Sequence, residues 1–390
     1  MSRATLVKPP PIDPSKSHIE NVLELTALRD IGPDIFTNTR PLWHPPGARG
    51  IYGGAAIAQS LAAAQKTIPP PNPANGQATY LVHSMHCYFV LAGDASIPIL
   101  YHVERVREGK SFMTRTVQAR QRGKCIFTTT LSFVREGSAG EKTIDHEMPL
   151  PEGVREELKR HLAEAEAEMN AEDGDDVKAE NDVDEPVTVK KEKEAYGEEG
   201  SGPFLSKRLP IVNSTSTEIH TKKTRQWIKA RGRISPSSGH EAHLSALAYM
   251  SDSYFIGTIS RVHNLWRFGS PNVPPPPSSS SPNPIPAALH PMAALESLEN
   301  NPHPEASYRP RVGMMVSLDH TIFFHRPREV RADEWMFSEM ESPWAGDGRG
   351  LVLQKIWGRG GRLVATCVQE GLVRLQQDNK GRITEKLVKL

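Results

Sequence analysis

The 390-residue sequence contains few cysteines and no long hydrophobic run. Cys87, Cys125 and Cys367 are widely spaced in apolar, strand-like stretches, which argues against a disulfide framework or a zinc site and favours a reducing compartment. No segment reaches the roughly 20 apolar residues of a membrane-spanning helix, and the first 17 residues lack the apolar stretch of a secretory signal. We therefore expect a soluble protein with no membrane span and no metal ion or other cofactor.

The sequence also lacks an excess of charge of either sign. Lys and Arg number 47 and Asp and Glu number 46, giving a formal net charge of +1. A nucleic-acid partner usually requires a basic surface, so this balance predicts no nucleic-acid partner. Hydrophobic residues make up only 37% of the chain. Two strongly polar segments account for that low share, and the remaining length suits two domains.

The two polar segments set the expected domain boundaries. Residues 138–203 carry acidic and lysine-rich runs with too little apolar surface to fold, which predicts an acidic, largely disordered linker. Residues 270–290 are rich in Pro and Ser and predict a surface loop. The expected units are a flexible N-terminus (1–17), an N-terminal domain (18–137), the linker, a C-terminal domain (204–378) containing the loop, and a C-terminal tail (379–390).

Each expected domain combines one mostly apolar helix with antiparallel strands. Residues 51–68 predict an alanine-rich helix, whose small residues on nearly all sides indicate burial. Gly53 and Gly54 lack the lysine of a phosphate-binding loop, so we assign them to close packing at the helix start. A second helix is expected at 243–254. Strands are expected at 82–90, 97–107, 111–121 and 125–135, and then at 224–230, 313–324, 335–342, 350–357 and 361–374.

The two domains repeat one pattern. The sequence HCYF at residues 86–89 matches HTIF at 320–323, each in a strand after the helix. The sequence GKCIFT at 123–128 resembles GRLVAT at 361–366, each opening the last strand of its domain. This long period predicts a duplicated α+β unit, in which each antiparallel sheet curls round its helix.

Three blocks of sequence point to one enzyme family. They are GGAAIAQSLAAA at 53–64 with VHSMHCYF at 82–89, AYMSD at 248–252, and SLDHTIFFHRP at 317–327 with VQEGLVR at 368–374. In these blocks the chain resembles the acyl-CoA thioesterase II family, whose members are double hotdogs. The resemblance implies two tandem hotdog domains, each a long buried helix wrapped by an antiparallel sheet. It also implies hydrolysis of fatty acyl-CoA to free fatty acid and CoA, with acyl-CoA as the substrate.

The resemblance also implies an active site in the second domain. The family combines an Asp on the second hotdog helix, a Thr before the Asp-His of the next strand and a Gln in the last strand. These positions are Asp252, Ser317 and Gln369 here. Ser in place of Thr keeps the hydroxyl but loses the methyl that restricts its rotamer. The neighbouring Asp319 and His320 are expected to support the site by hydrogen bonds.

These residue types suit thioester hydrolysis. A thiol of pKa about 8.5 leaves without a strong general acid, so the reaction needs an activated water and donors for the developing oxyanion. Asp252 lies in a mostly apolar sequence, where burial should raise its pKa and make it a better base. The amide of Gln369 can hold the same water without competing for its proton.

The duplication predicts one active site per chain. Leu131 aligns with Gln369 in the last strand, and the positions near Leu61 and Ala62 align with Asp252. The first domain has apolar residues where the second has its polar site. We therefore expect the first domain to act as a structural partner.

The sequence leaves two other functions open. A hotdog enoyl-CoA hydratase would use an Asp with a nearby His, but His243 does not lie at the usual spacing. A non-catalytic acyl-CoA binding protein is compatible with the serine at position 317 and with the long inserts. Release of free thiol from acyl-CoA separates the thioesterase from both.

Localisation and assembly are expected from the C-terminal motif and from the way in which hotdog sheets join. Val388-Lys-Leu390 resembles the Ser-Lys-Leu peroxisomal address, so we expect a peroxisomal protein, with the cytoplasm as the alternative. Hotdog sheets commonly join at their edges, so we expect a homo-oligomer, a dimer or higher.

Overall fold

The computed structural model describes residues 9–45, 48–71, 78–160, 163, 202–267 and 310–377. Four expectations concern residues outside these ranges: most of the acidic linker, the Pro/Ser-rich loop, the C-terminal tail and the Val388–Leu390 motif.

The first half confirms the expected helix and its four strands. Two short strands near the N-terminus were not predicted, because three or four residues give too little alternation to recognise. The elements are α1 His18–Leu23, β1 Leu25–Ala27, β2 Ile35–Asn38, α2 Gly53–Gln65, β3 Tyr80–Phe89, β4 Leu100–Glu108, β5 Phe112–Gln121 and β6 Lys124–Arg135.

The second half repeats this order. Its elements are β7 Phe204–Val212, β8 Lys223–Ala230, α5 Gly239–Ser251, α6 Gly257–Val262, β9 Val312–Ser317, β10 Asp319–Phe324, β11 Met336–Gly346, β12 Arg349–Trp357 and β13 Leu363–Leu375. The helix expected at 243–254 begins four residues earlier and ends at Ser251. It ends there because the Ser253 N–H bonds back to the Met250 carbonyl and Tyr254 adopts a positive φ of 54°.

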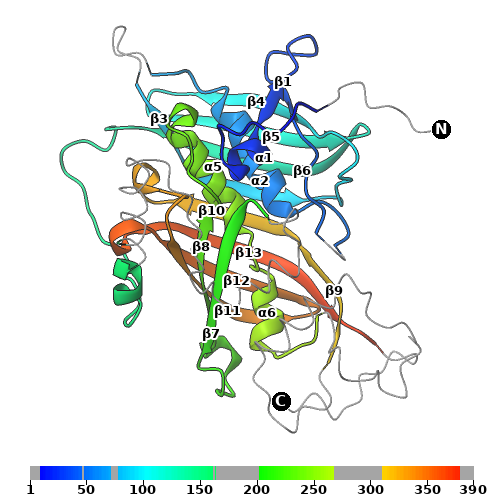
Figure 1. Ribbon diagram of the computed structural model, residues 1–390, viewed down its shortest axis with the longest axis vertical. Coiled ribbons are helices and arrows are strands. Elements are labelled where there is room, and N and C mark those ends of the chain that lie inside the picture. Colours follow the sequence, from blue (N-terminus) through cyan, green and yellow to red (C-terminus); the bar gives the residue numbers. More distant parts are fainter. Residues whose placement is uncertain are drawn as a thin grey trace, which may run out of the picture.

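The strands of both halves form one continuous antiparallel sheet of 13 strands, in the order β1-β2-β4-β5-β6-β3-β10-β13-β12-β11-β8-β7, with β9 paired to β13. The halves meet where β3 pairs with β10, with Cys87 opposite His320 (Figure 1). We call the face that contacts α2 and α5 the inner face, and the opposite face the outer face. The architecture is the expected pair of buried helices wrapped by antiparallel sheet.

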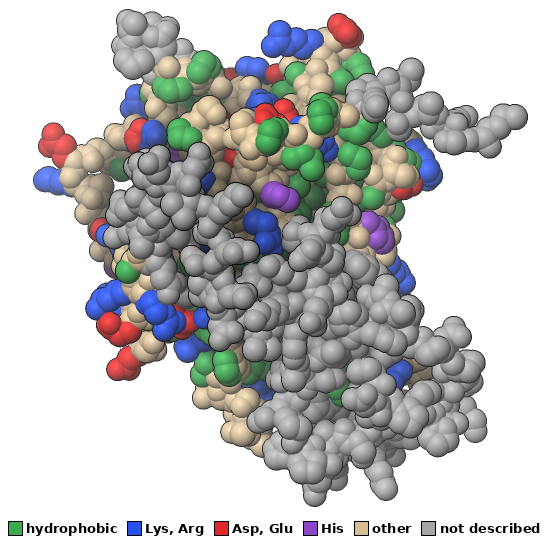
Figure 2. Space-filling view, viewed as in Figure 1, with side chains coloured by type: hydrophobic (Ala, Val, Ile, Leu, Met, Phe, Trp, Pro, Cys, Tyr) green, Lys and Arg blue, Asp and Glu red, His purple; other side chains and the backbone are tan. Residues whose placement is uncertain are grey.

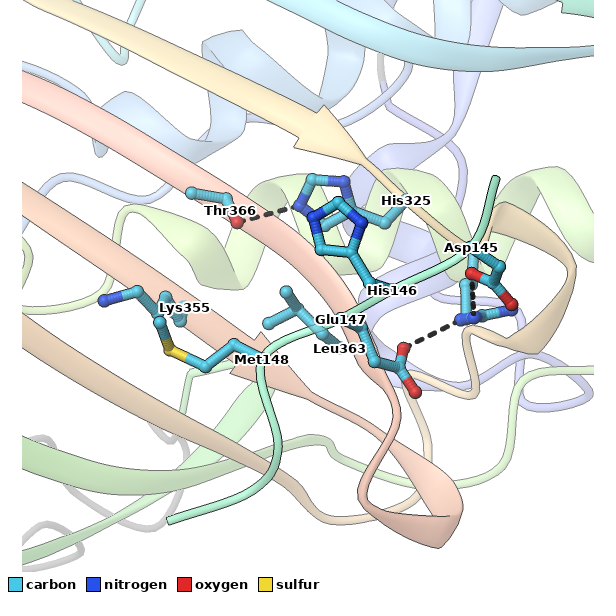
Figure 3. Close-up of a pocket in the computed structure, with 9 residues that line it drawn as sticks. Asp145, His146, Glu147, Met148, His325, Lys355, Leu363 and Thr366 are labelled. Carbon is cyan, nitrogen blue, oxygen red and sulfur yellow. Dashed lines mark hydrogen bonds and ion pairs between the residues drawn. The ribbon is translucent and has the colours of Figure 1, made fainter. Parts of the chain in front are cut away.

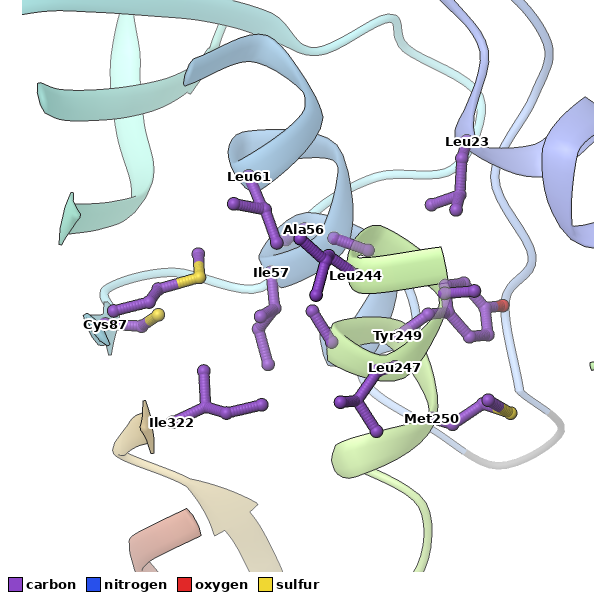
Figure 4. Packing of buried hydrophobic residues seen from close by; sticks show 14 of the residues in the cluster. Leu23, Ala56, Ile57, Leu61, Cys87, Leu244, Leu247, Tyr249, Met250 and Ile322 are labelled. Atoms are coloured by element: carbon purple, nitrogen blue, oxygen red, sulfur yellow. The ribbon is translucent and has the colours of Figure 1, made fainter. Parts of the chain in front are cut away.

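The two long helices pack against each other in the core. Apolar side chains such as Ile57 and Leu61 from α2 meet Leu244 and Leu247 from α5, all fully buried (Figure 4). Each such side chain contributes about 1.5–3 kcal/mol by leaving water. The helix backbones come close at Gly54, where a Cβ would lie 2.3 Å from the Tyr249 carbonyl oxygen. A glycine at position 54 is therefore needed for this contact.

The first part of the expected linker packs on the outer face of the second half. The Trp357 indole N–H donates to the Met148 carbonyl at 3.0 Å, and Arg326 Nε donates to Glu147 Oε2 at 2.9 Å. Between this segment and the sheet lies a cavity of about 540 Å³ (Figure 3). Beyond it, apolar residues four apart form a small second core: Leu150, Val154 and Leu158 on Trp227, Phe337, Trp357 and Leu363.

The surface carries charges of both signs. On the visible part of the face in Figure 2, acidic and basic side chains are interspersed, as the near-zero net charge predicts. Within the described ranges, no helix is long and apolar enough to cross a membrane.

Candidate active site

The site lies where the ends of the two long helices meet. Asp252 is the residue after α5, at its C-cap, and not within the helix as the sequence predicted. The first residues of α2, Gly53 and Gly54, lie against it. A carboxylate at a helix C-terminus is disfavoured by the helix dipole, whereas the N-terminus of a neighbouring helix favours it. The antiparallel packing of α2 and α5 supplies that compensation.

Two donors hold the Asp252 carboxylate. Gln369 Nε2 donates to Asp252 Oδ1 at 2.9 Å, and the backbone N–H of Gly54 donates to the same carboxylate. At Gly53 a Cβ would lie 2.7 Å from Asp252 Oδ2 and 2.9 Å from the Phe89 ring. Sequence reasoning assigned these glycines to packing and missed their role in the site. The signal was present, since two glycines open the helix and the first N–H groups of any helix need partners from outside its own ladder.

Burial makes Asp252 a better base. Desolvation raises the pKa of its carboxyl to about 6, although the hydrogen bonds from Gln369 and Gly54 oppose this rise. The group is then ionised near neutral pH, yet its proton affinity is well above that of an exposed aspartate. A pKa just below the working pH is the optimum for a general base.

Gln369 presents a free acceptor to the same place. The residue is fully buried on β13, and its Nε2 is used by Asp252. Its Oε1 is buried and has no hydrogen-bond partner in the described part of the chain. A buried amide oxygen without a partner is costly, which points to a bound water or substrate group as its partner.

Ser317 lies beside this pair without touching it. It is opposite Gly371 in the β9–β13 ladder, two residues from Gln369 and on the same inner face. Such diagonal neighbours on one face of a sheet lie about 7–8 Å apart, within reach of long side chains such as Gln369. Its hydroxyl forms no hydrogen bond within the described ranges. The structure therefore joins Asp252 and Gln369 directly and places Ser317 opposite Gly371, two residues along the strand from Gln369.

Asp319 and His320 each contact the site through a neighbour. Asp319 Oδ1 accepts the Glu370 N–H at 2.7 Å and so fixes the backbone next to Gln369. His320 is fully buried, and its Nε2 lies 3.0 Å from the Ser251 hydroxyl, next to Asp252. Burial lowers the pKa of His320 to about 3, so its ring is neutral.

Comparison with known proteins identifies the family. Residues 40–134 match the family model "Acyl-CoA thioesterase N-terminal domain", and residues 179–373 match "Acyl-CoA thioesterase C-terminal domain". The chain belongs to the acyl-CoA thioesterase family. It is 32% identical to acyl-coenzyme A thioesterase 8 of Rattus norvegicus, over 94% of this chain and 91% of that protein. It is 26% identical to the peroxisomal acyl-coenzyme A thioester hydrolase 1 of Saccharomyces cerevisiae, over 92% and 94%.

Solved structures confirm the fold. The acyl-CoA thioesterase II TesB2 of Mycobacterium marinum superposes with a TM-score of 0.56 at 25% identity, covering 92% of this chain and 98% of that one. The fold of this thioesterase is thus the expected double hotdog. Its function is acyl-CoA thioester hydrolysis, the first of the three functions considered from the sequence.

The position in the first half that is equivalent to Asp252 lies at the C-terminal end of α2. Both long helices have 13 residues, so Asp252 corresponds to Lys66, the C-cap of α2, and not to Leu61 or Ala62 as the sequence predicted. The error came from placing Asp252 inside a helix that ends before it.

A buried guanidinium occupies that end of α2. The fully buried Arg115 donates from Nε to Thr67 Oγ1 at 2.8 Å and from Nη2 to the Thr67 carbonyl at 3.3 Å. Its Nη2 also donates to Glu108 Oε1 at 2.6 Å. A cation here satisfies the C-terminus of α2, and the carboxylate beside it, Glu108, is held in an ion pair. This arrangement supports the expectation of one site per chain.

One expected correspondence between the halves is wrong. The sequence paired His86 with His320, but His86 points to the exposed outer face and His320 to the buried inner face. Side chains alternate along a strand, so two residues on opposite faces are not equivalent positions. The other expected pair, Leu131 and Gln369, does share a face. Leu131 lies on the inner face opposite Met85, and Gln369 lies on the same inner face as His320.

Proposed function

We propose that this thioesterase hydrolyses fatty acyl-CoA to free fatty acid and CoA with a water activated by Asp252. The observation that carries this proposal is a half-buried carboxylate, held between Gln369 and the N-terminus of α2, whose desolvation raises its pKa to about 6. Release of free thiol from acyl-CoA esters of increasing chain length, without hydration of an enoyl-CoA, tests it. Binding of acyl-CoA without thiol release would contradict it.

The reaction follows from the side chains. Asp252 takes a proton from the water as the hydroxide attacks the thioester carbonyl carbon. Gln369 Oε1 and the Ser317 hydroxyl orient that water, each as a neutral hydrogen-bonding group. The tetrahedral oxyanion then collapses, the bond between carbon and sulfur breaks, and the CoA thiolate takes the proton from Asp252. The products are one free acid and one CoA thiol.

The N-terminus of α2 is suited to stabilise the oxyanion. Its positive dipole end and its first N–H groups face the carboxylate at Gly53 and Gly54. Losing one such donor typically costs about 3–4 kcal/mol of barrier. At Gly54 the place of a side chain is taken by the Tyr249 carbonyl and the Tyr52 ring, so a substrate carbonyl oxygen would approach the backbone at Gly53. Phe89, beside Gly53, then forms part of the wall against the substrate.

The rate is expected to rise with pH through about 6. Protonated Asp252 cannot accept a proton, and its pKa is raised by burial to about 6, so kcat/KM should fall about tenfold per pH unit below that value. Above about pH 7 it should be constant. Thiol release measured from pH 4.5 to 8.5, with circular dichroism to confirm folding at each pH, checks this. Equal rates at both extremes would contradict it.

Ser317 is expected to contribute through its hydroxyl alone. Ser317→Ala should lower kcat about tenfold to a hundredfold, because one ligand of the water is lost. Ser317→Thr keeps the hydroxyl and should retain activity within a few fold of wild type. Steady-state thiol release from one acyl-CoA checks both variants. An alanine variant as active as the threonine variant would remove Ser317 from the site.

Two properties are proposed on indirect grounds. The peroxisomal relative from Saccharomyces cerevisiae supports a peroxisomal location, and the Val388–Leu390 motif lies outside the described residues. We also propose a homo-oligomer. Fluorescence microscopy of the chain with and without its last three residues tests the location.

A further inference from the structure

The second half carries a row of small residues that ends at the candidate site. Strand pairing places Ala345, Gly350, Gly371 and Ser317 side by side on β11, β12, β13 and β9. Gly371 is two residues from Gln369 on the same strand, so the row lies on the inner face, toward the helices. Over the width of four strands, this face therefore carries at most a methyl or a hydroxymethyl group.

Two isoleucines fill the space over the two glycines of this row. A Cβ on Gly371 would lie 2.3 Å from Ile256 Cδ1, and a Cβ on Gly350 would lie 2.2 Å from Ile259 Cδ1. Ile256 is the N-cap of α6 and Ile259 lies in its first turn, where the helix packs over β11 and β12 (Figure 1). Interiors are close-packed, so each isoleucine requires a glycine beneath it.

Ile256 is the isoleucine next to the site. It follows Asp252 by four residues, and the glycine beneath it, Gly371, pairs with Ser317. Its side chain is half-buried and packs against the core. Ile259 lies over the neighbouring strand, which is about 4.8 Å further away. A substrate group held at the candidate site would therefore meet Ile256 before Ile259.

A polar atom beside Ile256 points to a bound ligand at this place. Gln369 is fully buried, and its Oε1 has no hydrogen-bond partner among the residues that the structure describes. Such an atom requires a partner from a water or a substrate. A thioester held there extends in two directions from its carbonyl carbon, with CoA on one side and the acyl chain on the other.

Exposure indicates which side takes the acyl chain. On the side of the first half, the chain continues from Phe89 into Val90 and Leu91, which are 50% and 52% exposed. On the side of the second half, α6 packs on the sheet and its Val262 is 1% exposed. The phosphates of CoA must remain in water, whereas an alkyl chain is stabilised by leaving it. The acyl chain therefore belongs on the α6 side, against Ile256.

We propose that Ile256 determines which acyl groups this thioesterase accepts, an inference that rests on the proposed role of Asp252. Isoleucine is stiff at χ1, and its Cδ1 is seated on Gly371, so the side chain cannot turn away from the substrate. It narrows the space beside the thioester carbonyl. The site thus favours straight acyl chains over chains with a methyl branch at the carbon next to the carbonyl.

Ile256→Ala tests the proposal through a ratio of two substrates. In wild type, kcat/KM for a straight-chain acyl-CoA should exceed that for its 2-methyl analogue about tenfold or more, the effect typical of one methyl group in a substrate pocket. Ile256→Ala opens the space over Gly371 and should bring this ratio close to one. The matched control is Ile259→Ala, which removes the same atoms over Gly350, one strand further away, and should leave the ratio unchanged. Thiol release from both esters measures the ratio.

Two further variants change the same space. Ile256→Val removes only Cδ1 and should give a smaller shift in the same direction, which covers the case in which the alanine variant does not fold. In a double variant with Ile256→Ala and Gly371→Ala, the alanine at position 371 refills the space that Cδ1 left, so the ratio should return toward the wild-type value. A loss of stability alone lowers both rates equally and cannot change the ratio.

The possible failures are distinguishable. A wild type that hydrolyses both esters equally well, or equal ratios in Ile256→Ala and Ile259→Ala, would overturn the role of Ile256 and leave the proposed function standing. A wild type that releases thiol from neither ester would overturn the proposed function, and the role of Ile256 with it.

Discussion

Asp252→Asn is expected to lower kcat by about three orders of magnitude, the effect typical of losing a general base. Asparagine keeps the shape and still accepts the hydrogen bond from Gln369 Nε2, but it cannot take a proton from water. Thiol release under saturating acyl-CoA measures the loss. Substrate binding should change little, because proton transfer from water to Asp252 takes place only in the transition state.

The same substitution is expected to stabilise the fold. The pKa of Asp252 is about 6 in the folded protein and about 3.8 in an exposed aspartate, so its ionisation costs stability that develops from pH 3.8 to 6 and is complete above 6. Asp252→Asn should raise the free energy of unfolding at pH 8 by about 1–3 kcal/mol and leave it nearly unchanged at pH 4. Full activity in this variant would reject Asp252 as the base.

Arg115→Met is expected to lower the free energy of unfolding by about 3–5 kcal/mol. The change removes the donors to the Thr67 hydroxyl and carbonyl oxygens at the buried end of α2. The hydroxyl keeps its bond to the Ala64 carbonyl, whereas the Thr67 carbonyl loses its guanidinium donor. Urea unfolding at pH 7.5 measures the loss. Activity per folded molecule should stay within a few fold of wild type, because Arg115 lies at the end of α2, and the proposed base, Asp252, lies at the end of α5.

The control for this prediction is Arg105→Met. Arg105 is 45% exposed and forms a two-point pair with Asp34 on the same sheet. An exposed pair of this kind contributes about 0.2–1 kcal/mol. If Arg115→Met lowered the free energy of unfolding no more than this control, the buried guanidinium would not be what stabilises the end of α2. A large loss of activity in the folded variant would show that this place also takes part in catalysis.

The two variants should therefore change stability and activity in opposite ways. At the proposed catalytic end, a desolvated carboxylate is expected to lower stability and supply reactivity, as strained or desolvated groups at active sites often do. At the equivalent end of α2, a buried cation supplies stability and no reactivity. The two halves provide two similar helix ends, and on the proposed mechanism the charge at each end decides which one is the enzyme site.

The sequence by itself determined much of this protein. Alanine and glycine runs fixed the buried helices, alternation fixed most long strands, and the blocks around Asp252, Ser317 and Gln369 identified the family and its candidate site. Local patterns suffice there because helix burial and strand alternation are periodic and short-range.

Only the tertiary structure decided what each residue contacts. It moved Asp252 from within a helix to its end, gave Gly53 and Gly54 a role in the site, and separated His86 from His320 by a change of face. The first finding depends on a turn, the second on a contact between two helices, and the third on a shift of one residue along a strand. None of these three features gives a periodic pattern in the sequence. The raised pKa of Asp252 has the same origin, because desolvation is set by distant parts of the chain that pack around the carboxylate.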